Sequence, residues 1–547
     1  MNDALLQVQQ DLQAHWGLDF YRAGRVVTAM CSPKTVDELV AACGLSHRSV
    51  GQIVAALEPL LERDGELVRL SPEHADEARA RFAGPLPVDD PWTMLARQDP
   101  RLAALTETLA SRPRADRDLD HVAATPLTAM KRALYLSQRF DLRRATVLML
   151  GDHDMTAVAL AHVVPDIDLV VVDIDERLLG YIAELSRARG WRIRTRFADL
   201  RVELPPSLLG QCDLVFTDPP YNPEGVGLFL RRGIQALRDG EFSRLLLAYG
   251  HGEHQRSLGL QVQSVLHSLR LLNEAVLPAF HQYNGAPALG GRSDLYVLRP
   301  TRNSAAAARS ESARDNIYTR GRRARETNPD ALPAALQTHI QGLLGEGARW
   351  FGAPPSIEGL SSLPKASVRD YIQGLRSGAR EVTGASTAVV SLYPNAAALL
   401  PRVCLSASAE RLLVCGPQRP LADLLAHPSA ERSLIFSRYQ LTERRQEGNA
   451  AVAILQRRDD APASPQEAVV REIGRRSRAK LANAWREALV RWAASNDRKL
   501  SKNDARRIIS ATTVGAAYGG CHLTELPLWA LQALWDDVAA SAGQVLA

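Results

Sequence analysis

Short apolar runs alternate with helix-like segments between residues 145 and 302. Runs at 146–150, 169–172 and 214–216 are separated by segments whose apolar residues recur at helical spacing. This alternation predicts βαβ units and a mostly parallel sheet. Further strand-like segments complete a set of seven, at 192–197, 244–248, 274–281 and 294–298. Residues 145–302 are therefore predicted to form a Rossmann-like α/β domain.

Acidic residues follow several of these strands directly. Asp152 and Asp154 come after the first strand, Asp173 ends the second, and Asp218 follows the strand at 214–216. Parallel sheets bind ligands at the carboxyl ends of their strands, where an acid like Asp173 holds a ribose. The first turn has one glycine, Gly151, where nucleotide-binding turns have several. Its two carboxylates would attract a polycation. We expect a nucleoside cofactor beside a positively charged second substrate.

Two further motifs follow later strands of the same sheet. Asp199 lies after the third strand, where S-adenosyl-nucleoside enzymes commonly contact the adenine. Asp218-Pro219-Pro220-Tyr221 is a rigid turn that projects its acid and its tyrosine. Enzymes that methylate amino groups of adenine, cytosine or glutamine share this turn. A structural turn or a helix-capping acid is the alternative for each motif alone, and their joint placement at strand ends favours a functional site.

The N-terminal part is predicted to contain two smaller regions. Residues 1–76 have the pattern of a winged helix-turn-helix, with Thr35 and Ser46 placed to cap two helices. Residues 1–70 carry six Lys/Arg against nine Asp/Glu. A DNA reader should instead show a basic footprint, so packing or dimerisation is the preferred interpretation. Residues 77–144 are predicted to be a helical linker region, with a helix beginning near Pro126.

The C-terminal part is predicted to be a separate α/β domain. Residues 303–330 are rich in Ala, Ser and Arg and are expected to be a flexible linker, basic run 320–325 included. In 331–547 a degenerate half-repeat of the catalytic sheet is expected, with strands at 386–395, 411–416, 433–437 and 451–456. Residues 466–507 carry twelve Lys/Arg against five Asp/Glu. A solvated basic face is preferred there over nucleic-acid contact.

Composition narrows the class of protein. The chain has 547 residues with a formal net charge of +5, which says little about partners. Its six cysteines form no CxxC pair and no metal-ligand pattern with histidine, so reduced thiols, a cytoplasmic location and no metal are expected. No apolar run approaches 18 residues, and no membrane association is expected.

The motifs at the strand ends resemble the branched-chain polyamine synthases, also called N4-bis(aminopropyl)spermidine synthases. These are aminopropyltransferases that also carry an N-terminal winged helix. The resemblance covers about residues 20–320 and rests on Gly151-Asp152-His153-Asp154, Val172 to Leu179, Asp199-Leu200-Arg201 and Asp218-Pro219-Pro220-Tyr221. His153 stands where the family usually has an acid, and Asn222 where it often has threonine. Residues after about 330 lie outside the resemblance.

The resemblance implies transfer of aminopropyl groups from decarboxylated S-adenosylmethionine to an amine of a polyamine such as spermidine, giving branched polyamines. The expected donor-binding residues are Gly151, Asp173, Ile174, Asp199 and Leu200. The expected acceptor-binding residues are Asp152, Asp154, Asp218 and Tyr221. Asp154, supported by Asp218 and Tyr221, is expected to take the proton of the attacking amine. A homodimer is expected, and a nucleic-acid partner is not.

Two other functions are compatible with the same residues. The first is S-adenosylmethionine-dependent methylation of amino groups through the Asp218-to-Tyr221 turn. The acids of the first turn oppose it for a nucleic-acid substrate. The second is a transcription regulator that senses a polyamine, and the acidic residues 1–70 oppose it. The sequence leaves open the acceptor, the number of transfers, the effect of His153 and the role of 331–547.

Overall fold

The structure is a computed structural model with two compact units. The first contains residues 1–169 and 212–321, and the second contains 170–211 and 322–547. The structure describes residues 3–84, 89–238, 242–285, 290–309, 317, 332–345, 348–352, 365–366, 368–373, 386–392, 396–426 and 430–546.

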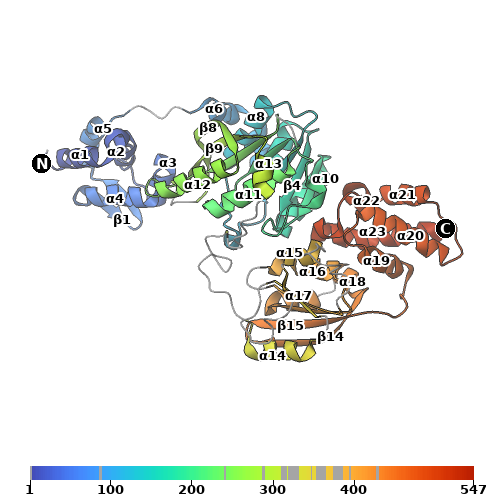
Figure 1. Cartoon of the computed structure of the whole chain (residues 1–547). Helices are drawn as coiled ribbons and strands as arrows, with labels where there is room; N and C mark the ends of the chain where they lie inside the picture. Colours follow the sequence, from blue (N-terminus) through green and yellow to red (C-terminus); the bar gives the residue numbers. More distant parts are fainter. Residues whose placement is uncertain are drawn as a thin grey trace. The chain divides into compact units, whose positions relative to one another are not determined.

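The N-terminal elements form a small helical region with a two-stranded hairpin (Figure 1). Thr35 begins α3 with a capping box, and Ser46 begins α4 by accepting a hydrogen bond from Ser49 N. Both caps satisfy helical N–H groups that have no partner within the helix. The elements are α1 (Asp3–Trp16), α2 (Phe20–Ala29), α3 (Val36–Cys43), α4 (His47–Leu57), β1 (Leu61–Asp64), β2 (Leu67–Leu70) and α5 (Pro72–Arg81).

Three helices connect this region to the large sheet. The longest, α8, begins at Pro126 as predicted, and Thr125 caps it by accepting a hydrogen bond from Thr128 N. Proline suits this position because its missing N–H would have no partner there. The three helices are α6 (Pro91–Gln98), α7 (Arg101–Ala110) and α8 (Pro126–Arg139).

The large sheet has seven strands in the order β5-β4-β3-β6-β7-β9-β8, which confirms the predicted seven-stranded α/β sheet. Strand β6 pairs with β3 and β7 in parallel, whereas β9 pairs with β7 and β8 antiparallel. The strands are β3 (Thr146–Leu150), β4 (Asp168–Asp173), β5 (Ile193–Phe197), β6 (Leu214–Thr217), β7 (Arg244–Tyr249), β8 (Leu271–Gln282) and β9 (Arg292–Pro300).

Helices alternate with the strands of this sheet (Figure 1). The turn before α11 is tight, because a Cβ at Gly225 would lie 2.8 Å from Pro220 O. This is the close backbone approach for which glycine is suited. The helices are α9 (Thr156–Val163), α10 (Glu176–Arg189), α11 (Pro223–Ala236), α12 (Arg256–Ser268) and α13 (Ser304–Arg309).

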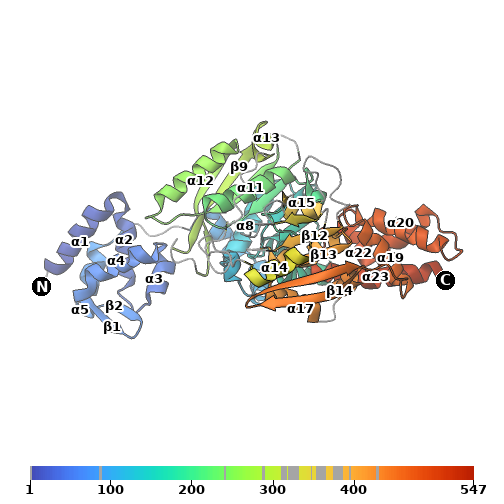
Figure 2. The ribbon, with the colours of Figure 1, turned by 60° about the horizontal axis from the view of Figure 1, so that its bottom comes forward.

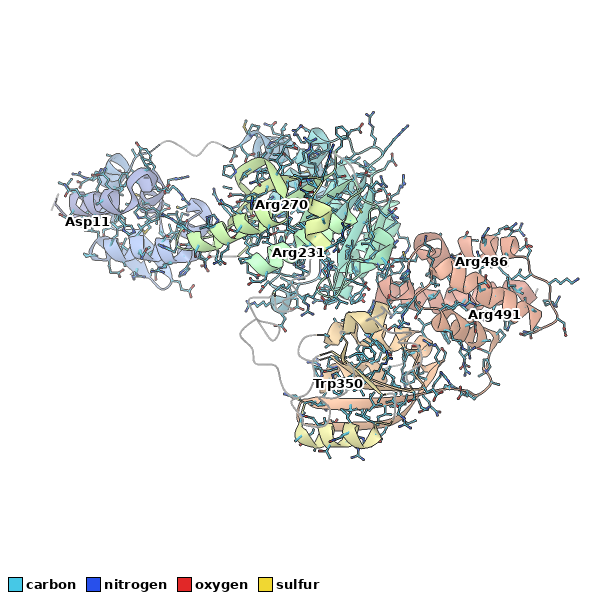
Figure 3. All side chains as sticks on the ribbon, in the orientation of Figure 1. Asp11, Arg231, Arg270, Trp350, Arg486 and Arg491 are labelled. Atoms are coloured by element: carbon cyan, nitrogen blue, oxygen red, sulfur yellow. The ribbon has the colours of Figure 1, made fainter. Side chains whose placement is uncertain are left out.

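A second sheet lies in the second unit, with the order β11-β10-β12-β13-β15-β14. Helix α14 (Ala334–Leu343) packs on it through Leu336 and Ile340, against a core that includes Trp350 (Figures 2 and 3). The strands are β10 (Arg349–Phe351), β11 (Lys365–Ala366), β12 (Thr387–Ser391), β13 (Arg411–Pro417), β14 (Tyr439–Glu447) and β15 (Ala450–Arg457).

The two sheets share a local strand order. Order β12-β13-β15-β14 repeats β6-β7-β9-β8, with the first pair parallel and the next two antiparallel in both. This order is the one expected of a half-repeat. Residues 393–395 of the proposed repeat lie outside the described residues.

Two sequence predictions in this half are wrong. Residues 433–437 were expected to be a strand, yet 430–436 form helix α18 (Ala430–Phe436). Leu434 and Ile435 are buried there, and a short apolar run fits a buried helix as well as a strand. Within the expected flexible linker, residues 304–309 form α13. The basic run 320–325 lies outside the described residues.

The chain ends in a group of helices that includes the predicted basic segment. Arg486 and Arg491 lie on α20 (Figure 3). Arg491 forms an ion pair with Glu472, as does Arg475 at 3.2 Å, so part of the positive charge is balanced locally. The helices between the strands of the second sheet are α15 (Val368–Gln373), α16 (Leu400–Ser406) and α17 (Gln418–Ala426). The helices after it are α19 (Pro465–Arg475), α20 (Leu481–Ala494), α21 (Lys502–Ser510), α22 (Thr513–Tyr518) and α23 (Leu528–Leu546).

Candidate active site

Arg132 lies at the centre of a buried cluster of charges in the first unit. It belongs to α8, in which every residue from 128 to 136 is buried. Its Nη1 donates to Asp154 Oδ2 at 2.7 Å, and its Nη2 donates to Asp218 Oδ2 at 2.6 Å. Hydrogen bonds between ionised partners are about twice as strong as neutral ones. One guanidinium therefore joins two acids that follow different strands.

Two tyrosine hydroxyls complete the surroundings of Asp218. Tyr283 donates to its Oδ2 at 2.7 Å, and Tyr221 donates to its Oδ1 at 3.0 Å. The two hydroxyls are 2.8 Å apart. Ser293 Oγ is 2.9 Å from the Tyr283 hydroxyl and 3.0 Å from His281 Nδ1. The predicted pair Asp218 and Tyr221 is thus part of a continuous polar network that reaches β9.

Asp152 has a different environment from Asp154. Its Oδ1 accepts from Thr156 N at 2.7 Å, and its Oδ2 accepts from Ala157 N at 2.9 Å. Asp152 therefore occupies the N-terminus of α9, the position at which other sheets bind an anion. The preceding Gly151 has φ +69°, in the left-handed region that favours glycine. Asp152 therefore caps α9, as the helix-capping alternative predicts, whereas Asp154 belongs to the charged cluster around Arg132.

The segment before α8 contributes to the same cluster. Ala124 N donates to Asp154 Oδ1 at 2.6 Å, so both oxygens of this carboxylate are engaged. Asn284 N donates to Ala123 O at 2.8 Å, which ties the segment to the end of β8. The segment before α8 therefore supplies a backbone donor to the site.

The pKa values of the acids diverge. Burial raises the pKa of Asp154, but the Arg132 guanidinium and the Ala124 N–H outweigh it and hold the pKa below its ordinary value. Burial raises the pKa of Asp218, and the neighbouring Asp154 raises it further against the opposing effect of Arg132. Burial also raises the pKa of Asp152 to about 8, against its two backbone donors. Paired acids with diverging pKa values are a feature of acid–base sites.

Residues deeper in the network are held neutral. Burial and then the charge of Asp218 raise the pKa of Tyr221 and of Tyr283 well above 10. Burial lowers the pKa of His281 well below its usual range. The tyrosines therefore act as hydrogen-bond donors at neutral pH, and they do not compete with Asp218 for a role as base.

His153 contacts a second histidine. Its ring stacks on that of His121, with the ring centroids 4.4 Å apart and an angle of 16° between the planes. His153 is buried, with 7% of its surface exposed. The residue that replaces the usual acid of the resembled family is therefore packed against the segment preceding α8.

Four of the five expected donor-binding residues, all except Gly151, belong to the second unit. Asp173 ends β4, and its Oδ1 accepts from Asp175 N at 2.8 Å. Ala198 N donates to Asp173 O at 3.1 Å, which brings the ends of β4 and β5 together. Asp199 pairs with Arg201 through bonds of 2.9 and 2.6 Å. The structure thus places Ile174 and Leu200 on two adjoining loops.

Three functional candidates were missed in the sequence. Arg132, Tyr283 and Ser293 belong to no motif, and the structure alone brings them to Asp218. One signal was available for Arg132. Together with Lys131 it places two cations within a helix whose neighbours are apolar, and buried cations require acidic partners. Tyr283 directly follows β8 and Ser293 lies on β9, so neither belongs to a turn after a parallel strand.

Neither a metal-ligand cluster nor a membrane-spanning helix is found among the residues that the structure describes. No three His, Cys, Asp or Glu side chains among these residues gather in a way that could hold a metal ion. No helix in the same residues combines the length and apolar character needed to cross a bilayer.

The mostly parallel sheet, with acids after its strands, has the architecture of a Rossmann-like α/β domain. Comparison with known families then indicates which family this part of the chain resembles. Residues 102–294 match the family model described as the branched-chain polyamine synthase A C-terminal domain. The predicted resemblance to branched-chain polyamine synthases is confirmed for this segment. The segment contains all the acids of the candidate site, namely Asp152, Asp154, Asp173, Asp199 and Asp218.

Curated relatives match part of the chain. An uncharacterized protein of Methanocaldococcus jannaschii is 36% identical over 187 residues, 34% of this chain and 47% of that protein. The N(4)-bis(aminopropyl)spermidine synthase of the same organism is 35% identical over 138 residues, 25% of this chain and 39% of that protein. The synthase of Thermus thermophilus is 34% identical over 130 residues, 24% and 38% of the two chains. The chain spans less than half the length of these relatives.

A solved structure is similar over a longer stretch. The branched-chain polyamine synthase from Thermus thermophilus, in complex with N4-aminopropylspermidine and 5′-methylthioadenosine, is 22% identical with a TM-score of 0.41. The similarity covers 58% of this chain and 96% of that chain.

Proposed function

We propose that this chain is an aminopropyltransferase that transfers an aminopropyl group from decarboxylated S-adenosylmethionine to an amine of a polyamine such as spermidine. The observation that carries this proposal is the buried cluster of Asp154, Asp218 and Arg132 within the family-matched segment. Such a cluster suits a cationic acceptor, because it offers negative charge and a proton acceptor in one place.

The first turn supports the choice of donor. Asp152 already occupies the helix N-terminus, and a donor carboxylate would meet its oxygens there. Decarboxylated S-adenosylmethionine has no such carboxylate, so the acid does not oppose its binding. Asp173 would hold the ribose and Asp199 the adenine, with Gly151, Ile174 and Leu200 giving the nucleoside room and apolar contact.

The proposed reaction is a single displacement. The acceptor nitrogen forms a bond to the aminopropyl carbon next to the sulfonium, and the carbon–sulfur bond breaks. Its electron pair goes to sulfur and leaves neutral 5′-methylthioadenosine. The nitrogen must be unprotonated to attack, although a free amine has a pKa of about 10. A carboxylate that removes the proton therefore assists the step.

Basicity and exposure favour Asp218 over Asp154 as this proton acceptor. Both acids accept hydrogen bonds on both oxygens, but the pKa of Asp154 is lowered, which makes it the weaker base. Asp218 has a raised pKa, and its side chain is 14% exposed against 7% for Asp154. Asp154 would then supply fixed negative charge, and Tyr221 would orient Asp218. In-line positioning of donor and acceptor would supply much of the rate.

The N-terminal region is proposed to be a winged helix-turn-helix used for packing. Ser46 N and Ser49 Oγ at the start of α4 both donate to Glu253 Oε2 at 3.3 Å. Arg22 also pairs with Glu253, at 3.2 Å. The Glu253 carboxylate thus lies at the N-terminus of α4, the helix that would have to contact DNA bases. A homodimer and a cytoplasmic location stay predictions.

Product analysis tests the proposed function. Purified protein is incubated with a panel of polyamines and either decarboxylated S-adenosylmethionine or the intact molecule, and product masses are measured. We expect aminopropyl additions only with the decarboxylated donor. Methyl additions with intact S-adenosylmethionine would instead establish the methyltransferase alternative. Asp218→Asn serves as the control for a contaminating enzyme, because it should abolish most of the product.

A further inference from the structure

The C-terminal half contacts β5 and the start of α10, next to the acids of the proposed nucleoside site. All of these contacts lie within the second unit. On β5, Thr195 Oγ1 lies 3.0 Å from the Tyr518 hydroxyl and accepts from Trp529 Nε1 at 3.3 Å. The neighbouring Arg196 donates to Ala517 O at 3.3 Å, and its guanidinium lies over the Tyr518 ring. Residues 513–529 are therefore fixed to β5.

Arg402 of α16 connects the C-terminal half to both donor loops. Its Nη2 forms an ion pair with Glu176 Oε1 at 2.5 Å, three residues after Asp173. Its guanidinium lies 3.6 Å from the centre of the Phe197 ring, two residues before Asp199. The Arg402 side chain is 2% exposed. A buried arginine from outside the family-matched segment thus contacts the elements that carry the proposed ribose and adenine acids.

A second C-terminal segment completes the attachment of these loops. Leu528 N donates to Glu176 Oε2 at 2.8 Å, and Arg402 Nη2 donates to Leu526 O at 2.6 Å. Glu525 accepts hydrogen bonds from the backbone N–H and the hydroxyl of Ser207. Glu176 therefore has one oxygen facing α16 and the other facing the start of α23.

A small cavity of about 30 Å³ lies between these parts, lined by residues that include Phe197, Asp199, Arg402 and Glu525. A cavity of this volume can hold roughly one or two water molecules. The donor loops form part of its wall, so the contacts across it bear directly on their positions.

We propose that Arg402 is a positioning residue for the donor nucleoside, and that residues 331–547 make donor binding depend on this contact. Arg402 fixes the start of α10 through Glu176 and the end of β5 through Phe197, so that the loops carrying Asp173 and Asp199 keep their spacing. Because the ion pair is buried, losing one partner leaves the other charge unpaired, and the loops must rearrange. The inference rests on the proposed function, since it takes the donor to be an adenine nucleoside.

The test compares two buried arginines of the same half of the chain. Arg438 donates to Leu405 O at 3.0 Å and to Ala407 O at 2.6 Å. Both acceptors lie at the end of α16, and neither belongs to residues 170–211. Arg402→Met and Arg438→Met should therefore cost similar packing, while only the first reaches the donor loops. Glu176→Gln is a milder second probe, because it keeps the shape and removes the charge.

Binding of 5′-methylthioadenosine is measured by calorimetry on full-length protein, at a temperature where circular dichroism shows each variant folded. We expect Arg402→Met and Glu176→Gln to weaken binding roughly tenfold, within the usual range of coupling between sites. Arg438→Met should bind as the wild type does. Turnover at saturating donor should stay within about threefold in all three, since the coupling acts on affinity.

Three outcomes decide the inference. Normal binding by Arg402→Met, or equal weakening by Arg438→Met, overturns it and leaves the proposed function intact. If Arg402→Met does not fold, Glu176→Gln decides, and normal binding by that variant overturns the inference. If the wild type itself does not bind 5′-methylthioadenosine, the donor assignment and the inference fail together.

Discussion

Arg132 bridges Asp154 and Asp218 with nitrogen–oxygen distances of 2.7 and 2.6 Å. The arginine comes from α8, and the two acids follow β3 and β6. The bridge offsets part of the repulsion between two carboxylates that lie close together in a buried site. Arg132 lowers the pKa of both acids, yet the pKa of Asp154 is below and that of Asp218 above the ordinary value, and the catalytic proposal depends on that difference.

Replacing Arg132 should destabilise the protein strongly. Arg132→Met leaves two buried acids without their shared cation, which typically costs about 3–5 kcal/mol. Thermal unfolding followed by circular dichroism measures the effect. Arg139→Met on the same helix is the control, because the Arg139 side chain is 55% exposed and its loss should change stability little. Equal unfolding temperatures for the two variants would contradict the proposed role of the bridge.

Asp218→Asn should lower kcat by roughly 10²–10⁴, the usual scale for removing a general base. The donor affinity should barely change, because the proposed donor acids are Asp173 and Asp199. Asp173→Ala should do the reverse and weaken donor binding first. Steady-state kinetics together with calorimetry separate the two effects. Near-normal turnover by Asp218→Asn would show that the proton is taken elsewhere.

Asp154→Asn tests the original expectation that Asp154 itself takes the proton. The lowered pKa of Asp154 predicts a different result from that of a base. We expect kcat to fall by the same order as with Asp218→Asn. Because Asp218 must lose its proton before it can act as the base, kcat should still rise with pH in Asp154→Asn. The pH profile of kcat is the measurement. Loss of the pH dependence in Asp154→Asn, with retention in Asp218→Asn, would return the role of base to Asp154.

Asp152 should make stability fall as the pH rises. Its folded-state pKa is raised to about 8, whereas an unfolded aspartate titrates near 3.9. Between these values the folded state binds more protons, so the contribution is complete below about pH 4 and lost towards pH 8. Urea unfolding at pH 5 and pH 8 should show a smaller pH difference in Asp152→Asn than in the wild type. An unchanged difference would mean that Asp152 is ionised throughout.

The full chain should not bind duplex DNA at physiological salt. Glu253 accepts hydrogen bonds at the start of α4, and residues 1–70 are acidic overall. Fluorescence anisotropy with labelled DNA is the measurement. Glu253→Gln provides a sharper comparison, because binding that appears only in this variant would show that the carboxylate masks a DNA-reading helix. Tight, salt-sensitive binding by the wild type would overturn the packing interpretation.

The sequence was most informative where local chemistry determines structure. The apolar runs located all seven strands of the large sheet, and the Thr125-Pro126 pair marked the start of α8. The strand-end acids were visible because a parallel sheet brings strand ends together. Arg132 and Tyr283 were not visible, because their meeting with Asp218 depends on how α8 and β8 pack. The helix at 430–436 was missed because a short apolar run does not distinguish a buried helix from a strand.

The position of β5 at one end of the sheet order has a consequence for solubility. An end strand presents unpaired backbone groups that can pair with another chain, and natural proteins commonly cover such strands. Here Tyr518 and Trp529 contact the middle of β5 from the C-terminal helices. A chain shortened to the family-like part would lose these contacts. We therefore expect such a chain to aggregate more readily than the full chain, independently of any effect on the donor.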